Sequence, residues 1–315
     1  MRIDARRGTI AAGFAALAIV PLIAYATDQP FYLDLFTRVM VFAIAALSLD
    51  LILGYGGLVS FGHAAYLGLG SYSVGILDHY GFTNGLVQFG TAIGVSSLSA
   101  FFIGAISLRT SGLSFVMITL AFAQMLYFLF ISLNVFGGDD GMSIDSHSRF
   151  GPIDLSNPTI LYYFVLAVLV LFFAIAARLV ESRFGMVLRG AKSNARRMVA
   201  VGFPVYRYRL AAFVISAAMC GVAGALLANQ LLFVSPNIMH WARSGEIIIM
   251  VILGGIGTLV GAVMGAALYV ILEHELSALT PHWLVILGPL LILVVLFAKR
   301  GVAGFLVRER ESARG

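Results

Sequence analysis

Asp50 is a carboxylic acid inside a long apolar run, and a glycine-rich, partly polar segment follows it at 54–72, GYGGLVSFGHAAYLGLGSY. An ionisable side chain at membrane depth is costly and usually faces a cavity or a partner group. Asp50 therefore either lines a pathway or bonds to backbone that the break at Gly54 and Tyr55 sets free. Irregular backbone in a membrane needs protein or water around it. The segment indicates a lined pathway.

Ser60 and His63 flank Gly62 just beyond this break. They either stabilise the broken helix through local hydrogen bonds or make polar contact with a solute. Helix N-termini that open onto a glycine break can hold a carboxylate through free amides, without a charged side chain. We therefore include Ser60 and His63 among the candidate pathway residues.

Two further patterns lie nearer the C-terminus. Glu246 follows a Ser-Gly pair at the start of an apolar stretch. It either caps the positive end of a helix or acts as a gate. Gly257, Gly261 and Gly265 recur every four residues, which predicts one helix face that packs closely on a neighbour.

Enzyme chemistry finds little support in the residues. Glu273-His274-Glu275 suggests a metal site, but a zinc-protease helix needs a second histidine at the position that Ala278 occupies. The other histidines are scattered, and no Ser–His–Asp order suggests a nucleophile. We predict no catalytic residue, no metal and no cofactor.

The composition is that of a membrane protein. Hydrophobic residues make up 60% of the chain and charged residues only 11%, whereas soluble domains carry roughly 25% charged residues. A span needs about 20 apolar residues. The sequence predicts one transmembrane domain over 1–315, with apolar stretches near 10–27, 35–53, 61–77, 86–107, 113–136, 159–179, 210–234, 245–272 and 283–298.

Charge placement predicts the orientation. The segment 178–209 carries eight basic residues against Glu181, whereas 137–158 carries four aspartates against Arg149. Basic loops stay in the cytoplasm, so both chain ends, which are also basic, belong inside. Nine crossings would leave the tail outside, so we expect 245–272 to form two short helices that meet at 254–258. The prediction is an all-α protein with about ten membrane helices or half-helices, and the net charge of +5 gives no reason to expect nucleic acid.

The chain offers no site for nucleotide hydrolysis. A phosphate-binding loop needs a Gly-Lys pair, and the two lysines, Lys192 and Lys299, both follow alanine. If transport is driven by ATP, the motor is therefore a separate subunit.

The basic loop at 180–209 is where such a motor could dock. Its centre, 187–201, predicts a short interfacial helix with an apolar side, and Gly202 suits the helix stop. The alternative is a helix that lies on anionic lipid headgroups. The candidate coupling residues are Arg189, Lys192, Asn194, Arg196, Arg197 and Gly202.

Four motifs stand out: LDLILGYGGLVSFGHAAYLGLGSY at 49–72, GGDDG at 137–141, SRFGMVLRGAKSNARRMVAVGFPVYRYRLAAFVISA at 182–217 and FVSPNIMHWARSGEIIIMVILGGIGTLVGAVMGA at 233–266. Through these motifs the chain resembles, over roughly 35–305, a known family, the LivM-type permease subunits of ATP-binding-cassette importers for branched-chain amino acids. The chain departs from the family's usual loop at Ser193-Asn194-Ala195, where acidic residues are common, which puts a particular ion pair with the ATPase in doubt.

The resemblance implies a multi-pass protein of the inner (plasma) membrane. Its implied partners are a second, similar permease, two cytoplasmic ATP-binding-cassette ATPases, an extracytoplasmic substrate-binding protein and membrane lipid. Alternatives are the same importer class acting on urea or short amides, and a self-sufficient secondary transporter or channel.

Overall fold

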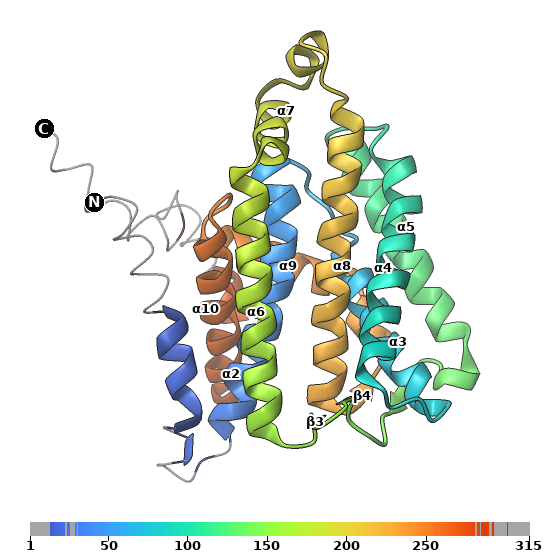
Figure 1. Cartoon of the computed structure of the whole chain (residues 1–315), viewed down its shortest axis with the longest axis vertical. Coiled ribbons are helices and arrows are strands. Elements are labelled where there is room, and N and C mark those ends of the chain that lie inside the picture. The colour runs from blue at the N-terminus through green and yellow to red at the C-terminus, as the bar shows by residue number, and fades with distance from the viewer. Residues whose placement is uncertain are drawn as a thin grey trace, which may run out of the picture.

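The protein is a bundle of long helices, described here from a computed structural model that covers residues 13–22, 24–25, 29, 31–280, 282–283, 285–289, 292 and 301 (Figure 1). Within these residues, six helices are long and apolar enough to cross a membrane. They are α2 (Phe31–Asp50, continued by the π-helical turn η1, Leu51–Tyr55), α4 (Gly85–Ser107), α5 (Leu113–Ser132), α6 (Pro158–Glu181), α8 (Val205–Leu231) and α10 (Leu259–Leu279).

Shorter elements complete the bundle. They are a helix at Gly13–Leu22, α3 (His63–His79), α7 (Arg183–Ala200), α9 (Trp241–Gly254) and the 3-10 turns η2 (Asn134–Phe136) and η3 (Pro236–Met239). This confirms the helical, multi-pass class. The last predicted span, near 283–298, falls largely outside the described residues, and the predicted cytoplasmic ends lie outside them too.

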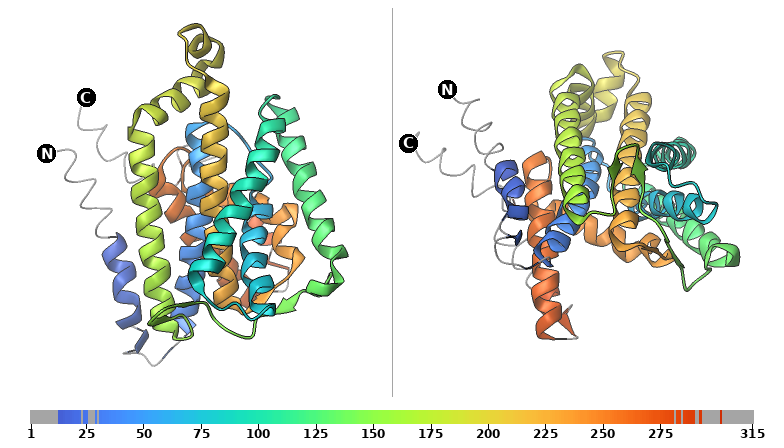
Figure 2. Two further views of the ribbon diagram at one scale, coloured as in Figure 1. Left: turned by 45° about the vertical axis from the view of Figure 1, so that its right-hand side comes forward. Right: turned by 60° about the horizontal axis from the view of Figure 1, so that its bottom comes forward.

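The structure contains short β-strands, which the prediction of an all-α protein did not include. β1 (Met142–Ser143) pairs antiparallel with β4 (Phe233–Val234), and β2 (Arg149–Phe150) pairs antiparallel with β3 (Ile153–Asp154). These strands lie at the end of the bundle opposite α7, as Figures 1 and 2 show. The acidic segment and the basic loop are therefore separated by the length of the bundle.

The centre of the bundle is formed by α2, α3 and α8. The spanning window of α2 is 83% buried and that of α5 only 22%, so α5 lies at the periphery. Small residues explain why α3 and α8 come so close together. A Cβ at Gly70 would overlap the carbonyl of Gly221, and a Cβ at Gly224 would overlap that of Leu67. Such close backbone approach is how helices associate in lipid.

Both glycine-rich segments interrupt a helix, as predicted. The first follows η1, where Gly57 adopts a φ of +69°. The second follows α9, where Gly255 and Gly257 have φ values of +116° and +79°. The sequence predicted two short helices over 245–272. α9 is short, but α10 has 21 residues and is long enough to span. α10 extends to Leu279, beyond the predicted limit at 272.

The helix contact at Gly224 gives a stability test. We expect Gly224→Leu to lower the stability of the protein by about 1–3 kcal/mol or more, because the side chain would force α8 away from the Leu67 carbonyl. Gly94→Leu is the matched control, since Gly94 is exposed on α4 and a Cβ there would meet no atom within 4 Å. Thermal unfolding in nanodiscs measures both. Equal melting temperatures would contradict the packing.

Candidate functional site

Asp50 connects the two helix breaks. It is fully buried at the end of α2, and its Oδ1 accepts a hydrogen bond from the Gly257 amide at 2.7 Å. The Gly257 amide has no partner within a helix because α9 has ended and α10 has not begun. Of the two predicted roles, Asp50 thus takes the bond to freed backbone, but at the break between α9 and α10 and not at the adjacent one.

Gly54 lets the two breaks touch. A Cβ at Gly54 would lie 2.5 Å from the Gly257 nitrogen and 2.7 Å from its Cα. No other residue type fits between these backbones. Tyr55, in contrast, is buried among Leu47, Leu51 and neighbouring apolar side chains of the core.

We call the contact between the two helix breaks, where Gly54 lies against Gly257, the junction. Lys192 reaches the junction from α7. Its Nζ donates to the Gly54 carbonyl at 2.6 Å, and its ammonium interacts electrostatically with Asp50. The Lys192 stem passes over Gly57, where a Cβ would meet its Cγ at 2.8 Å. The sequence grouped Lys192 with the outward-facing basic residues. In the structure Lys192 is exposed like its basic neighbours, but its ammonium is also directed to the carbonyl that the first break leaves without an α-helical partner.

Ser60 and His63 are fully buried, so neither lines an open path in this conformation. Ser60 Oγ accepts locally from the Gly62 amide at 3.2 Å. His63 Nε2 instead bonds Ser216 Oγ of α8 at 2.8 Å, and Ser216 donates its single proton to the Ser48 carbonyl at 2.5 Å. His63 Nε2 must therefore be the donor. The sequence predicted a local hydrogen bond for His63, whereas the observed bond joins it to a residue 153 positions away.

The start of α3 is satisfied by side chains that the sequence reasoning missed. Ser244 Oγ accepts from the Ala64 amide at 2.9 Å and donates to the Phe61 carbonyl at 2.7 Å. Thr119 Oγ1 accepts from the Phe61 amide at 3.3 Å. These bonds give protein partners to backbone that lipid could not satisfy. Hydroxyls in apolar helices were the available signal, although their partners depend on the tertiary fold.

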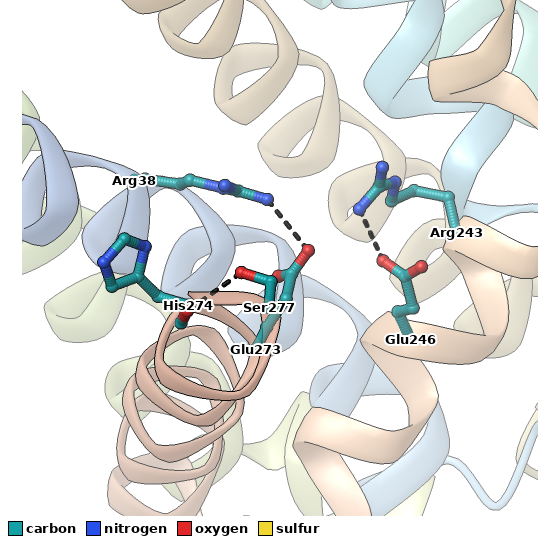
Figure 3. A network of polar contacts seen from close by, with 6 residues as sticks. All are labelled: Arg38, Arg243, Glu246, Glu273, His274 and Ser277. Atoms are coloured by element: carbon teal, nitrogen blue, oxygen red, sulfur yellow. Dashed lines mark hydrogen bonds and ion pairs between the residues drawn. The ribbon is translucent and has the colours of Figure 1, made fainter. Parts of the chain in front are cut away.

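Glu246 is not a helix cap. α9 begins at Trp241 after the cap residue His240, so Glu246 lies beyond the first turn. Its Oε2 pairs with Arg243 Nη1 one turn earlier at 2.5 Å (Figure 3). A second ion pair joins Arg38 of α2 to Glu273 of α10 at 3.1 Å. The sequence analysis missed it, although an arginine inside the apolar stretch at 35–53 was a signal.

The basic loop forms a bent helix. The prediction of a continuous helix at 187–201 was wrong at Asn194, which has φ −157° and ψ 96°. Asn194 Oδ1 accepts from the Arg197 amide at 2.9 Å, as an N-cap does, so a second helical segment starts there. At its end Gly202, with φ +95°, donates to the Val199 carbonyl at 2.9 Å, and the predicted helix stop is confirmed.

The two sides of α7 differ sharply. Val187, Leu188 and Ala191 are buried, and Arg209 of α8 donates to the Ala191 carbonyl at 3.2 Å. The coupling candidates are all exposed: Arg189, Lys192, Asn194, Arg196, Arg197 and Gly202. Val199, which was expected on the apolar side, is 60% exposed because the bend at Asn194 turns it outward.

The glycine triplet does not lie on one helix. Gly257 is in the break, and only Gly261 and Gly265 belong to α10. A Cβ at either would overlap the backbone of α9, at Gly254 and, for Gly265, also at the Met250 carbonyl. These glycines hold α9 against α10 within the chain.

Comparison with known proteins agrees with this architecture. The profile of the family described as "Branched-chain amino acid transport system / permease component" matches residues 31–296. The chain belongs to this permease family. The match begins at the first residue of α2 and contains every element of the junction, so the broken helices and α7 are parts of a transport subunit.

The family members with similar sequences include the high-affinity branched-chain amino acid transport system permease proteins LivM of Salmonella typhimurium and Escherichia coli. Each is 27% identical, over 91% of this chain and 74% of the relative. A probable LivM permease of Methanocaldococcus jannaschii is 24% identical, over 86% of this chain and 93% of its own length. No solved structure matches the chain.

The junction makes a prediction for Lys192. We expect Lys192→Met to destabilise the protein by about 1.5–3 kcal/mol, because it removes a charge-assisted hydrogen bond from the Gly54 carbonyl. Arg189→Met on the exposed side of α7 is the control and should stay within about 0.5 kcal/mol of wild type. Denaturation in nanodiscs measures both.

A double-mutant cycle with Asp50→Asn separates this bond from general damage to α7. Asparagine keeps an oxygen for the Gly257 amide but removes the charge beside Lys192. The double variant should lose less stability than the sum of the losses in the two single variants, because both substitutions act on one cluster. Strict additivity would show that Lys192 and Asp50 act independently.

Proposed function

We propose that this chain is a translocation subunit of an ATP-binding-cassette importer that carries branched-chain amino acids across the inner (plasma) membrane. The family match over 31–296 carries the proposal, and the LivM relatives support the substrate. The partners would be a second permease, two cytoplasmic ATPases and an extracytoplasmic substrate-binding protein. The basic loop would face the cytoplasm, in keeping with the excess of arginine and lysine there.

The coupling element in this proposal is α7. Its exposed side presents arginines and two outward apolar residues, Val199 and Val201, which are 60% and 68% exposed. An ATPase bound there would push on a helix whose other side is buried. Since Lys192 connects α7 to Gly54, and Asp50 connects Gly257 to the end of α2, such a push would reach both helix breaks.

The pathway residues then act as a hinge, not as solute ligands, in the present conformation. Asp50, Ser60 and His63 are fully buried and hold the broken backbone together. Movement of the breaks would open the path between the two permeases. Glu246, which is partly exposed at membrane depth, is the one predicted pathway side chain that a solute could approach.

Reconstitution tests the importer assignment. Liposomes that contain this chain, its second permease, both ATPases and a loaded binding protein should accumulate labelled leucine only with ATP. Urea should not accumulate. Leucine flux through this chain alone would favour the self-sufficient transporter, and urea uptake would favour the amide importer.

The coupling helix makes a separate prediction. Replacing Arg196 and Arg197 with Glu should reduce ATP-dependent leucine uptake strongly while membrane insertion persists, because the charge of the exposed side of α7 is reversed without touching its buried side. Glu181→Gln, an exposed change at the end of α6, is the control for expression. Uptake in cells, normalised to the amount of permease in the membrane, is the measurement. Unchanged uptake by the Arg196 and Arg197 variant would rule out this docking surface.

A further inference from the structure

Four charged side chains gather between the candidate spanning helices α2 and α10 and the shorter α9, apart from the junction of the breaks. We call them the charged quartet: Arg38 of α2, Arg243 and Glu246 of α9, and Glu273 of α10 (Figure 3). Arg38 pairs with Glu273 at 3.1 Å, and Arg243 pairs with Glu246 at 2.5 Å. The quartet therefore brings together three helices and carries no net charge.

The two ion pairs form one electrostatic unit. Glu246 interacts with Glu273 and Arg38 as well as with Arg243. Both guanidinium groups lie over the ring of Phe42, at 5.8 and 5.9 Å from its centroid. The two pairs thus share one aromatic surface and act on each other electrostatically.

The quartet cannot face lipid. Arg38 lies about 10 Å along α2 from Phe31, inside a 25-residue apolar span. The four side chains are nevertheless partly exposed, at 37% for Arg38, 16% for Glu273, 30% for Arg243 and 23% for Glu246. Ionised groups within a membrane face a protein interior or a water-filled path. This face of α2, α9 and α10 must therefore meet a path or another subunit.

The chemistry of the quartet matches a zwitterion. An amino acid brings one carboxylate and one ammonium group, which are complementary to one guanidinium and one carboxylate of the quartet. Because both solute and quartet are neutral overall, an exchange of partners buries no net charge. Urea and simple amides lack both charges and would leave an opened ion pair uncompensated.

We propose that the charged quartet is a transient binding site for the ammonium and carboxylate groups of amino acids on the translocation path. This rests on the proposed importer function and narrows its solutes to zwitterions. Arg38 would take the carboxylate and Glu273 the ammonium as their mutual ion pair opens, while Arg243 and Glu246 keep the site neutral.

The test uses the complete importer in liposomes with saturating leucine-loaded binding protein, so that recognition outside the membrane is the same for every variant. The readout is leucine transported per ATP hydrolysed. We expect Glu273→Gln to lower this ratio about tenfold or more, the effect of losing one charge-assisted contact. Glu275→Gln is the matched control, exposed two residues along the same helix, and should match wild type.

A charge swap separates a binding role from a structural one. Arg38→Glu with Glu273→Arg keeps an ion pair between α2 and α10, so thermal stability should recover relative to either single change. The ratio of leucine to ATP should stay low, because the polarity of the site is reversed. Recovery of the wild-type ratio by the swap, or an unchanged ratio in Glu273→Gln, would overturn the proposal. Failure of the wild-type importer to carry leucine would instead refute the proposed function.

Discussion

The hydrogen bond from the Gly257 amide to Asp50 makes the pair of broken helices possible inside a membrane. A helix that breaks there leaves amides and carbonyls without partners, and lipid supplies none. Two breaks lie against each other here, and Asp50 satisfies the amide of the second while Lys192 satisfies the carbonyl of the first. The buried carboxylate and the ammonium thus satisfy backbone groups that the two breaks leave without helical partners.

This contact has a counterpart farther along the same two helices. Arg38 precedes Asp50 by 12 residues, about 18 Å along α2, and Glu273 follows Gly257 on α10. α2 is therefore connected by polar contacts to the break just before α10 through Asp50 and to α10 itself through Arg38. Gly261 and Gly265 hold α9 against α10 between these points. α2, α9 and α10 thus form one structural unit, to which α7 is attached through Lys192.

The sequence was sufficient for the features that arise from local chemistry. Apolar length located all six candidate spanning helices of the described residues, although it also predicted spans at 10–27 and 61–77, where the helices are too short to be such candidates, and the glycine runs identified both breaks. The stop at Gly202 followed from the need for a positive φ at a helix end. The bend at Asn194 was missed because an asparagine inside a helical pattern can either point to solvent or cap a new segment, and only the fold decides.

Contacts between segments far apart in the chain could not be predicted from the sequence. Nothing in the residues around Asp50 names Gly257, which lies 207 positions away, as its partner. Lys192 was grouped with the other basic residues of the loop and is exposed like them, but nothing in the sequence indicates that its ammonium bonds to the Gly54 carbonyl. Arg38 lies in a predicted stretch and Glu273 just beyond the end of one, but their meeting depends on how α2 packs on α10.

These contacts imply that α7 and the two breaks move together. Spin labels at Ser193 of α7 and Ile256 of the second break, in a Cys220→Ala background, report this directly in the full importer, with Met125 of α5 as reference. On binding of a non-hydrolysable ATP analogue, we expect an unchanged Ser193–Ile256 distance while both residues shift relative to Met125. A change in the Ser193–Ile256 distance as large as the shifts relative to Met125 would show that α7 moves independently of the breaks.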